Sequence, residues 1–114
     1  MIKFRAWNSE TKEIEVFETY EEISELFMAL HLDDGFYSLM QSTGFLDKNS
    51  KEIFEGDILG TKNGLLNGVV EYRTDLGMWT NSLIRYNNFE RLCNIAGDRE
   101  IIGNIYENKE LLDA

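Results

Sequence analysis

Few residues in this sequence have side chains that enzymes commonly use for chemistry. There is one histidine, His31, and one cysteine, Cys93. A histidine without a nucleophile or metal partner is a poor candidate for catalysis, so we expect His31 to lie at the end of a helix, where a cation is favoured. We expect Cys93 to share an apolar helix face with Leu92, because a free cysteine usually packs as a small hydrophobe. Neither residue is assigned a catalytic role.

Four carboxylates cluster near the middle of the chain: Asp47, Glu52, Glu55 and Asp57. Paired carboxylates can bind Mg²⁺ or Ca²⁺ or transfer protons. Their spacing lacks the alternating acidic ligands of a calcium loop. The tripeptide Glu55-Gly56-Asp57 is typical of a turn whose aspartate accepts nearby backbone N–H groups. We therefore predict no metal site here.

The segment 60–64, Gly-Thr-Lys-Asn-Gly, superficially suggests a phosphate-binding loop. Such a loop has four residues between its glycines and a Lys-Ser/Thr pair directly after the second. Here there are three, and Leu65 follows, so we predict a hairpin connection. Serine-nucleophile, zinc and nicotinamide motifs are also missing. The sequence thus predicts no catalytic, cofactor-binding or metal-binding residues, no cofactor and no enzyme.

The elements that carry these residues are mainly short strands. Ile2, Phe4 and Ala6 alternate with their neighbours in a period of two, and Ile14 and Val16 alternate with glutamates in the same way. The polar stretch 8–12 between them suits a hairpin turn. Later strands are expected at 37–41, 52–54, 58–59, 68–73, 78–86 and 100–106, with turns at 47–50, 55–57 and 75–77.

One long amphipathic helix follows the first two strands. Thr19 lies three residues before Glu22, which is the spacing of a capping box. An apolar stripe then recurs at helical spacing, formed by Ile23, Leu26, Phe27 and Leu30. Asp33-Asp34-Gly35 is expected to end the helix. A short second helix is expected at 89–95, capped by Asn88 and stopped by Gly97, and a last turn is expected through Leu111 and Leu112, capped by Asn108.

These elements predict an α+β fold that is mostly antiparallel. Many short strands with glycine-bearing turns favour a curled sheet or a small barrel-like core, with the main helix over an open side. The 114 residues fit a single domain, 1–114, because no linker or repeat interrupts the chain.

Composition narrows the range of partners. The net charge is −10, from 21 acidic and 11 basic residues, and no three bases are adjacent. This argues against sequence-independent nucleic-acid binding, because most phosphate contacts in such complexes are made by Lys or Arg. No apolar run reaches the ~18 residues of a membrane helix, and the N-terminus is not followed by a signal-peptide core. With a single cysteine, which forms no internal disulfide, these features predict a cytoplasmic protein without membrane association.

Four ordered blocks of the sequence resemble the YopX-like family of phage and prophage proteins. They are Lys3–Trp7, Tyr37–Asp57, Gly68–Tyr72 and Ile101–Asn108, the last with Leu111 and Leu112. Ser50 stands where the family usually has glycine, which predicts that this turn needs no positive φ there. Lys109 replaces the usual proline. The resemblance implies a phage or prophage gene, expression in a bacterial cytoplasm and a mixed, mostly β fold, and it supplies no catalytic residues.

Two surfaces could serve recognition. Five aromatic side chains lie on predicted strands, where they pack in the sheet, stack on bases or anchor a partner: Trp7, Tyr72, Trp79, Tyr86 and Tyr106. The stretch 10–25 holds seven glutamates and one lysine, and is either a solvated face or a binding surface for a basic partner.

Our first functional hypothesis is a non-enzymatic protein-interaction or assembly module, binding itself as a homo-oligomer or binding a host or phage protein. A second is a nucleic-acid-associated small barrel in which Lys48, Lys51, Lys62 and Arg73 converge on one face. A third is an acidic inhibitor of a host DNA-binding protein.

Overall fold

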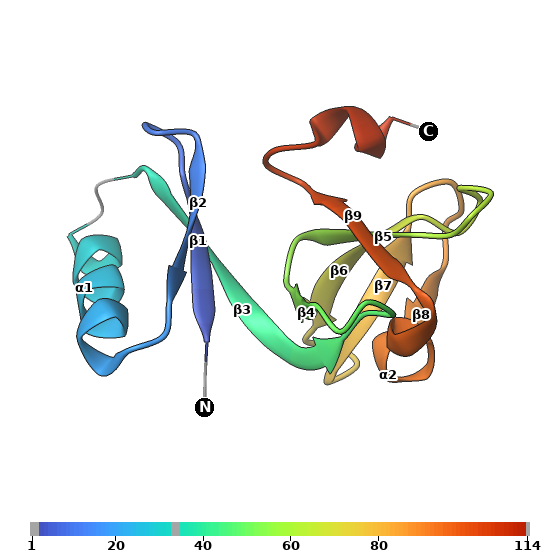
Figure 1. Ribbon diagram of the computed structural model, residues 1–114, viewed down its shortest axis with the longest axis horizontal. Helices are drawn as coiled ribbons and strands as arrows, with labels where there is room; N and C mark the ends of the chain where they lie inside the picture. The colour runs from blue at the N-terminus through green and yellow to red at the C-terminus, as the bar shows by residue number, and fades with distance from the viewer. Residues whose placement is uncertain (1–2, 33–34, 114) are drawn as a thin grey trace. The chain divides into compact units, whose positions relative to one another are not determined.

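The computed structural model describes residues 3–32 and 35–113 of the chain. Contacts within the chain divide it into two compact units, Met1–Ser42 and Thr43–Ala114. Each unit has its own helix, one strand continues across the boundary, and the strands pair antiparallel, which confirms the α+β prediction (Figure 1). The predictions for Ile2, Asp33 and Asp34 lie outside the described residues, and the single domain stays a prediction.

The first unit is a small sheet covered by a helix (Figure 1). Strand β1 (Phe4–Asn8) lies between β2 (Glu13–Phe17) and the first part of β3 (Tyr37–Leu46), antiparallel to both. The hairpin between β1 and β2 is closed by the Asn8 side chain, whose oxygen accepts the N–H groups of residues 10 and 11. The predicted turn at 8–12 is therefore confirmed.

Helix α1 (Tyr20–His31) begins as its sequence predicts. The Thr19 hydroxyl accepts the Glu22 N–H at 3.1 Å and the Glu22 carboxylate accepts the Thr19 N–H at 3.0 Å, which completes the capping box. Leu26 of α1 is buried against Ala6 and Phe17 of the sheet. Four half-buried side chains surround this core: Phe4, Ile23, Leu30 and Tyr37.

The alternation in β2 identified the strand but not its buried side. Phe17 pairs with Phe4 across the strands and is buried, whereas Val16 is exposed. Because side chains alternate along a strand, Glu15 shares the face of Phe17. Its charge is met there by the Asn8 amide at 2.8 Å and the Tyr37 hydroxyl at 3.2 Å.

The second unit is a curled, half-barrel sheet. Its strand order is β8-β7-β6-β5-β9, with β5 at Asp57–Gly60, β6 at Gly68–Arg73, β7 at Met78–Leu83, β8 at Phe89–Arg91 and β9 at Glu100–Asn104. The pairing of β5 with β9 shifts register at Ile58 and Leu59, an irregularity of the kind that bends a sheet. Strand β4 (Glu52–Phe54) pairs with β3.

The core of this unit forms inside the curl. Its buried members are Ile53, Leu59, Val70, Leu92 and Ala96. The last two come from α2 (Leu92–Ile95) and the 3₁₀ turn η1 (Ala96–Asp98). The prediction of a helix from Phe89 was wrong in extent, because Phe89–Arg91 pairs with β7 as a strand. Asn88 accepts the Phe89 N–H and does not cap α2.

Several other boundaries also differ from the predictions. The strand expected at 37–41 continues to Leu46, whereas those expected at 78–86 and 100–106 end at Leu83 and Asn104. The last turn is η2 (Lys109–Leu112). Asn108 precedes it, but its side chain accepts the Asn104 N–H and makes no cap. Among the helices of the described ranges, none is long and apolar enough to cross a membrane.

Candidate functional site

The most distinctive surface of the described chain is the outer side of α1. Tyr20, Phe27 and Met28 are 84%, 45% and 60% exposed, although surfaces usually carry large apolar side chains singly. They line an open hollow of about 490 Å³ together with Ile23, Ser24 and His31. We call these six residues the α1 stripe.

The sequence pattern explains the α1 stripe. Its positions follow one another at 20, 23, 24, 27, 28 and 31, which is the spacing of one helix face. This face is adjacent to the one that buries Leu26, and Ile23 belongs to both. Phe27 lies at the border too, since its ring meets that of Phe4 edge to face at 5.4 Å between centroids. The helix is therefore apolar over more of its circumference than its own sheet covers.

Ser24 shapes the surface. It is the small residue in the row Tyr20–Ser24–Phe27–His31, so the larger neighbours rise around it. The result is a depression that can accept a protruding apolar side chain, as a hole accepts a knob between packed helices.

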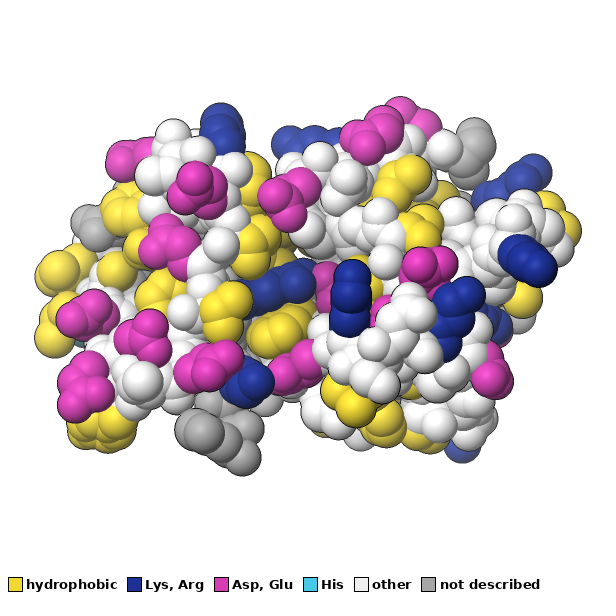
Figure 2. Space-filling model, in the orientation of Figure 1, with side chains coloured by type: hydrophobic (Ala, Val, Ile, Leu, Met, Phe, Trp, Pro, Cys, Tyr) yellow, Lys and Arg dark blue, Asp and Glu magenta, His cyan; other side chains and the backbone are white. Residues whose placement is uncertain are grey.

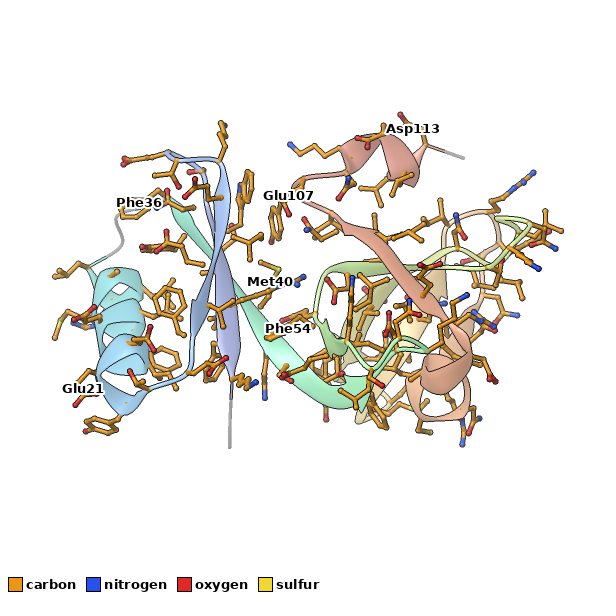
Figure 3. All side chains as sticks on the ribbon, in the orientation of Figure 1. Glu21, Phe36, Met40, Phe54, Glu107 and Asp113 are labelled. Carbon is orange, nitrogen blue, oxygen red and sulfur yellow. The ribbon has the colours of Figure 1, made fainter. Side chains whose placement is uncertain are left out.

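Acidic side chains border the α1 stripe. Glu21 and Glu25 are exposed, and within the described residues neither has a hydrogen-bond or ion-pair partner. Figure 3 shows Glu21 pointing away from the sheet, and Figure 2 shows acidic and hydrophobic side chains interspersed over α1 in that view. The apolar surface thus has a negative edge.

Other glutamates of the first unit already have partners. Two hydrogen bonds from Thr19, first that of its backbone and then that of its side chain, lower the pKa of Glu22 below its usual value. Glu18 lies 3.5 Å from the Lys3 ammonium. Glu15 accepts a hydrogen bond from Tyr37. Burial raises the pKa of the Tyr37 hydroxyl, and the negative charge of Glu15 raises it further. The seven-glutamate stretch is therefore partly structural, so the charge left for a ligand is smaller than the sequence suggests.

The structure places His31 where its sequence position predicts, but not Cys93. His31 lies in the last turn of α1, where its sequence position predicted it, and lines the α1 stripe. The prediction that Cys93 packs in the core was wrong, because Cys93 is exposed while Leu92 is fully buried. The short α2 explains the difference: with Phe89 in a strand, the four-residue helix buries only Leu92.

Two of the four clustered carboxylates, Asp47 and Asp57, stabilise turns. The Asp57 carboxylate accepts the Phe54 N–H at 2.7 Å across a turn in which Gly56 has a φ of +87°, as its sequence predicts. No group of three or more His, Cys, Asp or Glu side chains that could hold a metal ion occurs in the portion that the structure describes.

Asp47 organises the turn that follows β3. One carboxylate oxygen accepts the N–H groups of Asn49 and Lys51 at 2.8 and 2.9 Å, and the other accepts that of Ile101 at 3.0 Å. Burial opposes the charge, but the three N–H donors outweigh it and lower the pKa of Asp47. Ser50 in this turn has a φ of +63°. The prediction that this position needs no positive φ was therefore wrong.

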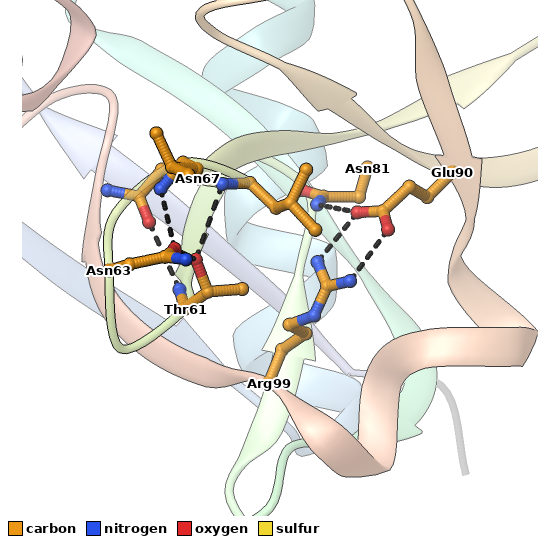
Figure 4. Close-up of polar contacts among 8 residues, drawn as sticks. Thr61, Asn63, Asn67, Asn81, Glu90 and Arg99 are labelled. Carbon is orange, nitrogen blue, oxygen red and sulfur yellow. Dashed lines mark hydrogen bonds and ion pairs between the residues drawn. The ribbon is translucent and has the colours of Figure 1, made fainter.

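The glycine-rich segment 60–64 is a hairpin connection, as predicted. It joins the antiparallel strands β5 and β6, and side chains fold the loop upon itself (Figure 4). The Asn67 side chain accepts the Thr61 N–H at 3.1 Å, and Asn63 accepts the Thr61 hydroxyl at 3.0 Å. These bonds use the polar groups that a phosphate loop would present to its ligand.

A second polar group in Figure 4 lies inside the half-barrel. Arg99 donates to both oxygens of Glu90 at 2.6 Å, and the Asn81 amide donates to the same carboxylate at 3.1 Å. Within the described part of the chain, the side-chain oxygen of Asn81 is buried without a hydrogen-bond partner, and it occupies the space that a side chain at Gly68 would need. The sequence did not predict this group because its members come from β7, β8 and the segment before β9 and match no motif.

The bases proposed for nucleic acid do not gather in the way that hypothesis requires. Lys62 lies in the loop before β6, whereas Arg73 is the last residue of this strand, which is roughly 20 Å long at the usual rise per residue. Arg73 is paired with Asp75 at 2.7 Å and Lys48 with Glu100 at 3.8 Å.

The aromatic side chains are also dispersed. Tyr72 and Trp79 meet edge to face across β6 and β7 at 5.2 Å between ring centroids. Tyr86 and Tyr106 lie outside strands, contrary to prediction. Tyr86, which is exposed, lines a polar recess of about 360 Å³ with Arg73 and Phe89. The guanidinium there already stacks on the Phe89 ring at 5.3 Å.

Comparisons with known proteins bear on the whole chain. The family model described as YopX protein matches residues 3–113. Among solved structures, the chain is similar to the crystal structure of protein EF1440 from Enterococcus faecalis, with a TM-score of 0.64 and 26% sequence identity over 99% of both chains. A search of curated proteins gave no match.

Proposed function

This chain belongs to the YopX protein family, and we propose that it is a non-enzymatic protein-interaction module that binds its partner through the α1 stripe. The observation that carries the proposal is the exposure of Tyr20, Phe27 and Met28 on one helix face. Exposed apolar surface of this kind gains free energy when a partner removes it from water.

The state of the candidate catalytic groups supports a role without catalysis. Asp47 and Asp57 accept backbone N–H groups, as those of a turn do. His31 lines the apolar α1 stripe, and the Cys93 thiol lies 3.6 Å from the amide oxygen of Asn94. General acid–base catalysis needs a group within hydrogen-bond distance of a reacting atom, whereas the Asp47 and Asp57 carboxylates are engaged by backbone N–H groups.

We take the partner to be a protein of a bacterial host or of a phage, as the family resemblance implied, and the site of action to be the cytoplasm. The alternative of an acidic inhibitor of a DNA-binding protein draws support from Glu21 and Glu25, which have no ion-pair partner in the described ranges. It would use the same surface, with charge in place of apolar contact as the main attraction. The nucleic-acid-associated alternative is opposed by the dispersal of Lys62 and Arg73.

Affinity capture from a nuclease-treated bacterial lysate tests the proposal. Three baits are compared: the wild-type chain, the double variant Y20A/M28A, and the control Y86A, which removes an exposed aromatic side chain from the second unit. A light-activated cross-linker at position 28 reports which captured protein touches α1.

We expect a protein that the wild type and Y86A retain, that Y20A/M28A loses, and that cross-links through position 28. If all three baits retain the same proteins, or if nuclease abolishes the capture, the proposed function is wrong.

A further inference from the structure

The chemistry of the partner can be inferred from two neighbouring rows of side chains on α1. The first row, Tyr20–Ser24–Phe27–His31, contains the depression at Ser24. The second row has the same spacing: Glu21, Glu25, Met28 and Leu32. The second row is acidic in its first half and apolar in its second half, where Met28 and Leu32 are 60% and 65% exposed.

This arrangement fixes where charge and apolar contact fall. The two carboxylates lie one turn apart near the start of the helix, and the exposed apolar side chains of the same row, Met28 and Leu32, lie toward its end. Tyr20 of the first row is exposed at the start. A ligand lying along this second row therefore meets negative charge at one end of its path and apolar surface at the other.

The overall charge points to a basic ligand. Residues 1–42 hold nine acidic and three basic side chains, a net charge of −6, whereas residues 43–114 have a net charge of −4 over nearly twice the length. Such a field speeds the approach of a cationic partner and slows that of an anionic one.

The same charges disfavour a second copy of this chain. In an antiparallel pair of α1 helices related by a two-fold axis, each flank meets the identical flank of the other copy. Because the two helices run in opposite directions, Glu21 and Glu25 of one copy would lie opposite the apolar Leu32 and Met28 of the other, where the carboxylates would lose water without gaining a cationic partner. In a parallel pair, the two acidic first turns and the positive helix ends would lie at the same level.

The geometry points to an amphipathic, basic helical segment of another protein as the ligand of the α1 stripe. This inference rests on the proposed function and adds the chemistry of the partner. The segment presents two Lys or Arg residues one turn apart to Glu21 and Glu25. An apolar side chain on its adjacent row enters the depression at Ser24, and further apolar residues cover Met28.

Two synthetic peptides test this inference with the full chain. Both are helical 18-residue sequences with the same leucine row, flanked in one by lysine and in the other by glutamate. Binding is measured by fluorescence anisotropy to the wild type, to Y20A/M28A, and to the charge-reversed variant E21K/E25K, whose substituted side chains make no described hydrogen bond or ion pair that would be lost.

We expect the lysine peptide to bind the wild type at least about tenfold more tightly than the glutamate peptide. Attraction at Glu21 and Glu25 in one complex, and repulsion there in the other, together give a free-energy difference of that order. E21K/E25K should reverse the preference, and Y20A/M28A should weaken both complexes. Raising the salt concentration should narrow the difference between the peptides.

Equal binding of the two peptides, no binding of either, or a preference unaltered in E21K/E25K would overturn the inference. Concentration-dependent dimerisation of the wild type that Y20A/M28A abolishes would assign the stripe to a second copy and would also overturn it. Capture and cross-linking through position 28 would still support the proposed function in the first three cases, so the two failures are distinguishable.

Discussion

Arg99 and Glu90 form a two-pronged ion pair, with both guanidinium nitrogens 2.6 Å from a carboxylate oxygen. Glu90 lies in β8 and Arg99 directly precedes β9, and these are the two edge strands of the five-stranded sheet. The pair thus connects the two edges of the curled sheet, since β8 and β9 are not hydrogen-bonded to each other in the sheet order. Asn81 of β7 orients the same carboxylate from within the sheet.

Substitution of Arg99 should destabilise the protein strongly. The Arg99 and Glu90 side chains are only 9% and 21% exposed, and removal of one member of a buried pair typically costs about 3 kcal/mol or more. We expect R99M to lower the free energy of unfolding in urea by about that amount. The matched control is K48M, which breaks the half-exposed Lys48–Glu100 pair and should cost less than about 1 kcal/mol. Similar losses in both variants would contradict this role for Arg99.

The same pair predicts how stability depends on pH. The hydrogen bonds from Arg99, against an opposing effect of burial, lower the pKa of Glu90 in the folded state. The unfolded chain therefore binds a proton first as pH falls, so the contribution of Glu90 is complete above its unfolded pKa of about 4.3 and is lost as pH falls toward the folded pKa.

Urea denaturation midpoints between pH 7 and pH 3 measure this effect. E90Q should be less stable than the wild type at pH 7, and the difference should shrink as pH falls through the window below about pH 4.3. Asp47, whose pKa is also lowered, should leave a residual acid dependence in E90Q. A constant difference between the two proteins over the whole range would exclude Glu90 as the titrating group.

Ser50 offers a stabilising substitution. Its φ of +63° lies in the left-handed region, where a residue with a Cβ is less stable by about 1–2 kcal/mol. S50G removes that strain but adds freedom to the unfolded chain, so we expect a net gain of up to about 1 kcal/mol. Thermal melting of S50G and S50A provides the measurement. S50A keeps the Cβ and should not be stabilised, and an equal gain in both would assign the effect to the lost hydroxyl.

The two compact units should unfold together if the chain is one domain, as its sequence predicts. Trp7 lies in β1 and Trp79 in β7, so each unit contains one tryptophan. Strand β3 runs without interruption through the boundary at residues 42 and 43. The single-tryptophan variants W7F and W79F should therefore give coincident fluorescence transitions in urea, as a two-state domain does. Separate midpoints in the two variants, each matching one phase of the wild type, would show two domains.

Local features of this protein were determined by the sequence itself. The capping box of Thr19 and Glu22, the turn at Asp57 and the strand Gly68–Arg73 all lie where their sequence patterns predict. Each depends on residues a few positions apart, whose backbone preferences and side-chain hydrogen bonds act within one segment. The family resemblance also followed from ordered blocks in the chain and was confirmed by the match over residues 3–113.

Only the tertiary structure decided which surfaces are covered. The helical spacing of Ile23, Leu26, Phe27 and Leu30 predicts an apolar face, but the width of the sheet beneath decides that Leu26 is buried and Phe27 is nearly half exposed. Cys93 is on the surface because Phe89 pairs with the preceding strand β7 and so lies in a strand instead of a longer helix. The contact of Arg99 with Glu90 likewise depends on the curl of the whole sheet. Such outcomes follow from the way separate elements pack and pair, which the backbone preferences within one segment do not specify.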